Sequence, residues 1–123
     1  MWESDLFLEI EKLNDELLNL VEDMEAKGIA LAHAELEYNV TKTNRGLIEK
    51  AEGIPVSFIG EFIRGYEDVA QKRLERDIAE SKYKASAEKI NVIKKRLSSY
   101  EEQAKREYSL RDTYYPVDFT GVE

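Results

Sequence analysis

Apolar residues recur at alternating steps of four and three in two stretches of the chain, and this spacing constrains the fold more than any other feature. The first stretch contains six such positions: Leu6, Ile10, Leu13, Leu17, Leu20 and Met24. The second contains five: Ile90, Ile93, Leu97, Tyr100 and Ala104. These steps align side chains along one side of an α-helix, as in a coiled coil. The sequence therefore predicts an all-α fold with two long, packed helices.

The two stretches differ in charge. Residues 1–28 contain nine acidic and two basic residues, whereas residues 67–111 contain nine acidic and twelve basic residues. Opposite charge favours pairing of these helices with each other, and a short connection makes them antiparallel. In the expected register Ala32 meets Ala87 and Ala34 meets Ala85, so that small residues permit close approach. We therefore expect a long antiparallel helical hairpin that resembles a coiled coil.

Glycine and proline mark the turn of this hairpin. Gly53-Ile54-Pro55 ends the first helix, because glycine favours a helix C-cap and proline cannot continue a helix. We expect a bend at Gly28, and the sequence leaves open whether Gly28 or Gly46 breaks the helix. The predicted parts are a hairpin domain over 1–111, with helices over about 4–52 and about 66–108 and a short helix in the tip 53–65, and an irregular aromatic and acidic tail over 112–123.

Some apolar residues of the first helix lie outside its seam. Phe7, Leu18 and Val21 are examples, and a pair of helices buries only one stripe on each. Self-association into a homo-oligomeric bundle would cover them, and association with a different protein is the competing explanation. We expect the homo-oligomeric bundle.

Composition excludes several classes of protein. No apolar run approaches the roughly 18–20 residues of a membrane span, and the acidic N-terminal segment differs from the basic start of a signal peptide. The chain has no cysteine, which excludes disulfides, thiolate catalysis and cysteine zinc sites. We expect a cytoplasmic protein that does not contact a membrane.

The chain shows no catalytic or metal-binding signature. His33 is the only histidine, and its neighbours Glu35 and Glu37 do not complete a metal site. Catalytic carboxylates converge in a cleft, which long helices do not form, and no glycine-rich phosphate loop is present. We therefore expect no enzymatic activity, no metal and no cofactor.

The turn of the hairpin is unusually apolar. It contains five large candidate residues for binding a protein partner: Phe58, Ile59, Phe62, Ile63 and Tyr66. The tail adds three aromatic candidates: Tyr114, Tyr115 and Phe119. Buried aromatic residues commonly dominate protein interfaces. The turn residues either fold over the ends of the helices or bind a partner, and the sequence leaves both open.

Two charged surfaces support alternative functions. An acidic face could imitate nucleic acid and occupy a basic groove on another protein; its residues are Glu9, Asp15, Glu16, Glu22 and Asp23. Cations near tyrosines could bind single-stranded nucleic acid; these cations are Lys82, Lys84, Lys94, Lys95 and Arg96. For each set the competing interpretation is an ordinary solvated or paired helix face.

From residue 34 to about residue 97 the chain resembles a family of small helical proteins encoded by tailed phages and prophages of Gram-positive bacteria. The shared pattern is a Gly-x-Pro-Val turn, a hydrophobic stretch, Arg-Gly and then a helix like Arg76-Asp77-Ile78-Ala79-Glu80-Ser81-Lys82-Tyr83-Lys84. The resemblance implies a phage origin, the cytoplasm of a bacterial host cell, and a gene close to those for DNA replication and recombination. It assigns no functional residue.

The first functional expectation is therefore a non-enzymatic phage accessory protein that binds a phage or host protein near the DNA replication or recombination module. The second is an inhibitor of a bacterial defence or host nucleic-acid enzyme, of the anti-CRISPR or anti-restriction type, that uses the acidic face as a decoy. The third is direct binding of single-stranded nucleic acid by the basic helix.

Overall fold

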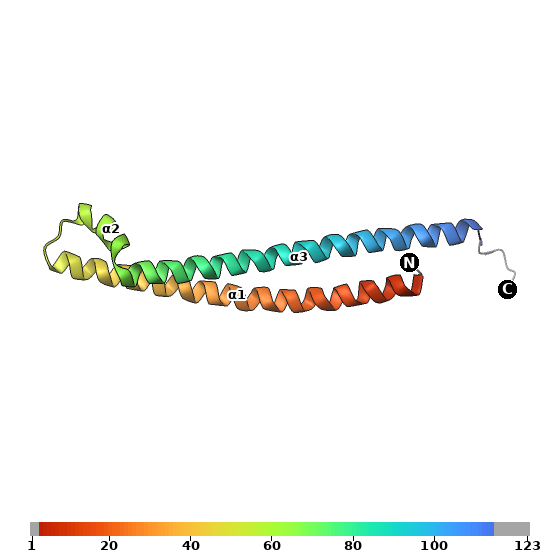
Figure 1. Ribbon diagram of the computed structural model, residues 1–123, viewed down its shortest axis with the longest axis horizontal. Coiled ribbons are helices and arrows are strands. Elements are labelled where there is room, and N and C mark those ends of the chain that lie inside the picture. The colour runs from red at the N-terminus through yellow and green to blue at the C-terminus, as the bar shows by residue number, and fades with distance from the viewer. Residues whose placement is uncertain (1–2, 115–123) are drawn as a thin grey trace, which may run out of the picture. The chain divides into compact units, whose positions relative to one another are not determined.

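A computed structural model describes residues 3–114, with side chains from residue 5 to residue 110. These residues form three helices and no strand: α1 (Glu3–Ala51), α2 (Val56–Gly65) and α3 (Glu67–Tyr114) (Figure 1). The predicted all-α class is confirmed. None of the described helices is both long enough and apolar enough to cross a membrane.

Helix α1 passes through both of its internal glycines without a break. It ends in a Schellman motif, in which the Gly53 amide donates to the Lys50 carbonyl at 3.1 Å and the Ile54 amide donates to the Glu49 carbonyl at 3.1 Å. Gly53 adopts a φ of 88°, which glycine tolerates far better than other residues. Pro55 follows as the N-cap of α2, so the predicted stop at Gly53-Ile54-Pro55 forms one sharp turn.

Helix α3 is longer than the sequence suggests. It continues to Tyr114, beyond the expected end near residue 108. Residues 112–114 are therefore helical, in contrast to the irregular conformation expected from residue 112 onwards. Leu110 and Arg111 in this stretch are good helix formers, which explains how the helix continues where apolar periodicity fades.

The chain divides into two compact units. Unit 1 consists of Met1–Val21 with Lys89–Glu123, and unit 2 consists of Glu22–Glu88. In the described part of unit 1, Leu13 of α1 packs with Ile93 and Leu97 of α3. Four partly buried residues surround this cluster: Ile10, Leu17, Leu20 and Tyr100. Seven of the eleven heptad-like positions thus lie in or around this core of unit 1.

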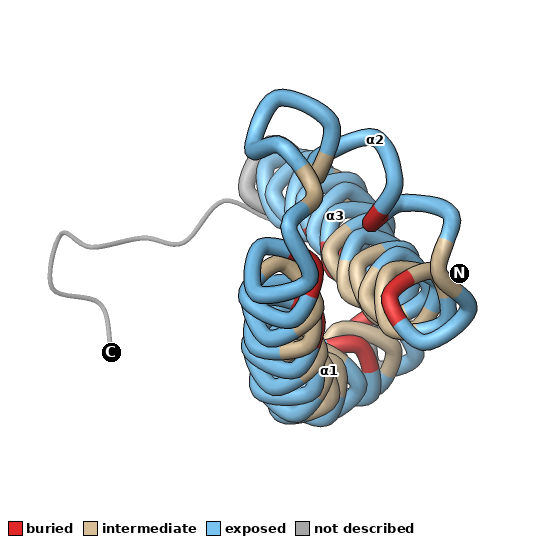
Figure 2. Tube along the Cα trace, turned by 90° about the vertical axis from the view of Figure 1, so that its left-hand side faces the viewer, coloured by how far each residue is buried: buried red, intermediate tan, exposed pale blue. Residues whose placement is uncertain are grey.

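Unit 2 has a core of its own, built from all three helices. Tyr38 of α1, Ile63 of α2 and Val69 of α3 are buried together, with Ile59 and Tyr66 packed against them. In each unit the buried positions lie where the helices meet, and the remaining positions are intermediate or exposed, as the red, tan and pale blue segments of Figure 2 show.

The register of α1 and α3 in unit 2 differs from the expected one by about two turns of helix. Ser86 donates a hydrogen bond to Asp23 at 2.9 Å, so Ala87 lies near Asp23 and not opposite Ala32. The Tyr83 ring lies against Gly28. Closer to the turn, Lys72 donates a hydrogen bond to Glu37 at 3.0 Å, and Arg45 forms an ion pair with Asp68 at 3.5 Å. These pairs run antiparallel within the unit.

The cause of this shift is the position of α2. Arg45 lies opposite Asp68, the second residue of α3, so α1 extends about two turns past the start of α3. Helix α2 folds back along this extension, and its Ile63 and Ile59 lie next to Gly46 (Figure 1). The expected register treated the connection as symmetric between the two long helices. It therefore misplaced the facing positions.

Opposite charge contributes less to the pairing of the helices than the sequence suggests. In unit 1, no ion pair joins the described acidic side chains of α1 to the described basic side chains of α3. In unit 2 two pairs cross between these helices, Arg45 with Asp68 and Lys72 with Glu37. The pKa of Lys72 is raised by its hydrogen bond to Glu37 and a second one to Glu75. Apolar contacts therefore hold unit 1 together.

Candidate functional site

Helix α2 divides the predicted partner-binding residues between two faces. Ile63 is 4% exposed and packs against Tyr38 and Val69, and Ile59, one turn earlier, packs against the same cluster. Residues four apart share a face of a helix. Ile59 and Ile63 therefore attach α2 to the other two helices and are not free to bind a partner.

The two phenylalanines of α2, in contrast to its two isoleucines, are exposed. Phe58 is 52% exposed and Phe62 is 55% exposed, and they too are four residues apart. Val56, at the start of α2, is also exposed. Val56 lies about 120–160° around the helix from the two phenylalanines, so we call Phe58 and Phe62 alone the outer face of α2. Both interpretations of the turn therefore apply: one half folds over the helices, and the other half remains accessible.

Tyr66 secures the end of α2. Its amide donates to the Ile63 carbonyl at 3.1 Å, and its ring lies 4.4 Å from the guanidinium of Arg45. The pKa of the Tyr66 hydroxyl is raised, first because the hydroxyl donates a hydrogen bond to the buried Glu49 carboxylate and second because the residue is partly desolvated. Arg45 in turn pairs with Asp68. These polar contacts fix the C-terminal end of α2, the helix that carries the outer face.

The aromatic candidates of the tail are only partly described. Tyr114 is the last residue of α3, and its side chain lies outside the described residues. Tyr115 and Phe119 also lie outside the described residues.

The acidic candidates do not form one described surface. Glu9, Asp15 and Glu16 belong to unit 1, whereas Glu22 and Asp23 belong to unit 2. Asp23 is engaged within unit 2, since it accepts hydrogen bonds from Lys27 at 2.7 Å and from Ser86 at 2.9 Å.

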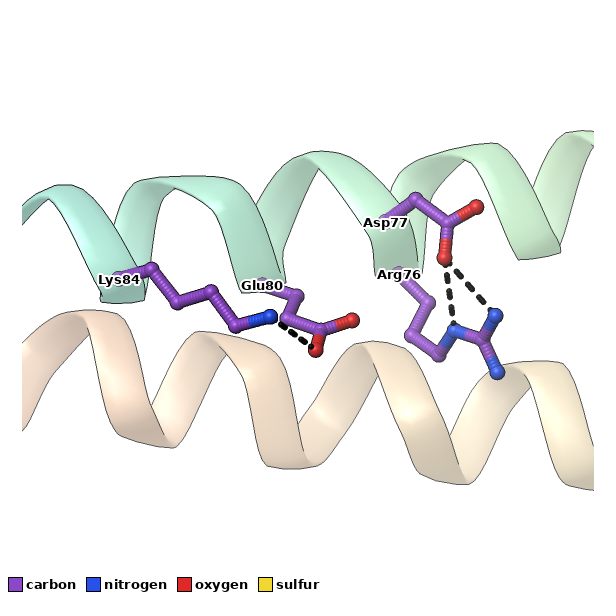
Figure 3. Close-up of polar contacts among 4 residues, drawn as sticks. All are labelled: Arg76, Asp77, Glu80 and Lys84. Atoms are coloured by element: carbon purple, nitrogen blue, oxygen red, sulfur yellow. Dashed lines mark hydrogen bonds and ion pairs between the residues drawn. The ribbon is translucent and has the colours of Figure 1, made fainter.

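The basic candidates are also divided between the units. Lys82 and Lys84 belong to unit 2, and Lys94, Lys95 and Arg96 belong to unit 1. Lys84 pairs with Glu80 at 3.1 Å, one turn earlier on α3 (Figure 3). All five are exposed, as expected of cations on a solvated helix.

Arg76, on the same helix, is a structural cation. Its guanidinium donates two hydrogen bonds to Asp77, at 2.8 and 3.1 Å (Figure 3). The same guanidinium lies 4.7 Å from the ring of Tyr38 on α1. Its pKa is raised mainly by the hydrogen bonds to Asp77. Arg76 therefore contributes to the packing of α3 against α1.

Four apolar residues on the outer side of α1 were not singled out by sequence analysis. These exposed residues of unit 2 are Ile29, Leu36, Val40 and Leu47. They follow one another at steps of seven, four and seven, and that spacing is the signal that could have identified them. His33 lies in the same stretch and is exposed, and no three potential metal ligands converge anywhere in the described part of the chain.

Comparison with protein-family models, with curated proteins and with solved structures finds no match for the chain. The functional argument therefore depends on the residues and contacts described above.

Proposed function

We propose that the protein is a non-enzymatic accessory protein that binds another protein through the outer face of α2. The observation that carries this proposal is the exposure of Phe58 and Phe62 on a helix whose other face is buried. Adjacent aromatic side chains held on a firmly packed helix are typical anchors of protein interfaces, because they bury a large apolar area at small entropic cost.

The packing of α2 strengthens the proposal. Ile59 and Ile63 hold it against α1, and Tyr66 holds its end through Glu49 and Arg45. A helix fixed in this way loses little conformational entropy when a partner binds. The polar contacts of Tyr66 therefore support binding without touching the partner.

The cellular setting follows from the resemblance to small helical phage proteins. It favours a phage or host partner in DNA replication or recombination. We further propose that the working form is a homo-oligomeric bundle of coiled-coil-like helical hairpins, because large apolar residues of α1 stay exposed, among them Phe7 and Leu18 in unit 1 and Leu36 in unit 2.

The proposal is tested by affinity capture from a nuclease-treated lysate of infected cells. The wild-type chain is compared with the double variant Phe58→Ser and Phe62→Ser. We expect the wild type to recover a replication or recombination protein and the double variant to lose it.

A second double variant, Leu74→Ser with Ile78→Ser, is the matched control. These residues are also four apart on a helix of unit 2 and are exposed by 51% and 46%. If the control loses the partner while the Phe58→Ser and Phe62→Ser variant keeps it, the assignment to α2 is wrong. Recovery of a defence nuclease would instead favour the alternative function, an inhibitor of a bacterial defence enzyme.

A further inference from the structure

The outer side of α1 in unit 2 carries a regular apolar stripe. Its four large residues, Ile29, Leu36, Val40 and Leu47, are between 49% and 62% exposed. His33 and Thr43 occupy the positions between them, so the stripe advances by steps of four, three, four, three and four. This is the spacing of a seam between two packed helices. The stripe spans about 27 Å at 1.5 Å per residue.

Charged residues avoid this side of α1. Between Gly28 and Leu47 there are four: Glu35, Glu37, Lys42 and Arg45. At 3.6 residues per turn, Glu35, Lys42 and Arg45 lie more than about 90° from the centre of the stripe, and Glu37 lies about 80° from it. Glu37 and Arg45 pair with Lys72 and Asp68 of α3, so both side chains are directed toward α3 and away from the stripe. The stripe itself therefore carries no charged residue, in a chain with 36% charged residues.

We propose that this stripe binds the same stripe of a second copy of the chain, with the two α1 helices antiparallel. This inference deepens the self-association part of the proposed function, because it names the face and the orientation. The interface lies on α1, on residues separate from the outer face of α2.

Charge limits the faces on which a second copy can bind. The chain has a net charge of −8, so two copies repel each other over most of their surfaces. The stripe is a long face on which two copies can approach without placing like charges against each other. Burying its large apolar residues also removes them from water, which favours association.

The sequence of the stripe favours the antiparallel orientation. With a two-fold axis between Leu36 and Val40, Ile29 faces Leu47 of the second copy and Leu36 faces Val40 of the second copy. His33 then faces Thr43 of the second copy. Every large apolar residue meets another, whereas a parallel pair would place His33 against its own copy. A two-fold axis also makes the interface identical on both chains, as in most homodimers.

The first test measures the mass of the protein in solution by sedimentation. We expect the wild type to have twice the chain mass of 14.3 kDa. Leu36→Glu should weaken the dimer by at least about 100-fold, because the two-fold axis brings two carboxylates into an apolar seam. Leu74→Glu, at an exposed apolar position of α3, is the matched control and should remain dimeric. A monomeric wild type, or loss of the dimer only in the control, would overturn the proposal.

The second test measures orientation and does not depend on a destabilised variant. Since the chain has no cysteine, single cysteines can be introduced without background. After mild oxidation, a mixture of Ile29→Cys and Leu47→Cys chains should form a disulfide between the two variants. Ile29→Cys alone should stay uncross-linked. Efficient cross-linking of Ile29→Cys with itself would show a parallel pair and would overturn the antiparallel arrangement.

These tests are separable from the test of α2. Leu36→Glu should still recover the partner of α2 in the lysate experiment, whereas the Phe58→Ser and Phe62→Ser variant should still dimerise. If the wild type does not dimerise but still recovers the partner, the inference on α1 is wrong and the proposal for α2 is unaffected.

Discussion

At the scale of single residues, two glycines of the turn have opposite roles. Gly53 has a φ of 88° and terminates α1, whereas Gly60 lies inside α2 with open space around its Cα. We predict that Gly53→Ala destabilises the protein by about 1–2 kcal/mol, because a side chain is strained in the left-handed region. Gly60→Ala should stabilise it by about 0.5–1 kcal/mol, because alanine favours a helix. Urea unfolding followed by circular dichroism measures both, and equal effects of the two changes would contradict this assignment.

The raised pKa of the Tyr66 hydroxyl predicts that the free energy of unfolding depends on pH. Its pKa is raised above the ordinary value of 10.0 by the hydrogen bond to Glu49, so the folded state holds this proton more tightly than the unfolded state. The resulting stabilisation is complete below about pH 10 and is lost as the pH rises through the raised pKa. The difference in unfolding free energy between the wild type and Tyr66→Phe should therefore shrink above pH 10.

Tyr108→Phe is the control for this measurement, because Tyr108 is 59% exposed and belongs to unit 1. Its difference from the wild type should stay constant over the same pH range. If the difference in unfolding free energy between the wild type and Tyr66→Phe were also constant, the hydrogen bond to Glu49 would not be the cause of a raised pKa at Tyr66.

At the scale of the element, α2 has a buried face and an exposed face that should respond differently to truncation. Ile63→Ala should cost about 2–5 kcal/mol of unfolding free energy, because it leaves a cavity between three helices. Phe62→Ala should change it by no more than about 1 kcal/mol, because more than half of that side chain is already in water. Chemical unfolding of both variants tests this contrast, and similar losses would mean that α2 has no free face.

The sequence alone predicts the two faces of α2, but it does not predict the position of α2 against α1 and α3. Ile59 with Ile63, and Phe58 with Phe62, are each four residues apart, so a helix must separate the pairs by about 100°. Which pair faces inward depends on contacts with Tyr38 and Val69, far away in the sequence. The folding back of α2 along α1, which also sets the register of α3, depends on the same contacts.

At the scale of the whole chain, the sequence predicts the long helices well, because apolar periodicity and the Gly53-Ile54-Pro55 stop are local signals. The division into two compact units has no comparable signal, since α1 and α3 each run through both units. The pairing of acidic and basic stretches was overestimated, since the described side chains of unit 1 show no ion pair between its helices. Surface charges are weak guides to packing.

The central claim is that the protein acts by an apolar contact with another protein. It is tested most directly by the dissociation constant of the purified complex with the captured partner, measured for the wild type at low and high salt. We predict less than about a threefold change between 50 and 200 mM salt, because an apolar contact is little affected by ionic screening. The Phe58→Ser and Phe62→Ser variant should bind at least about 100-fold more weakly at both concentrations. A loss of about a thousandfold with salt, as for contacts with phosphates, together with unchanged binding by the variant, would contradict the claim.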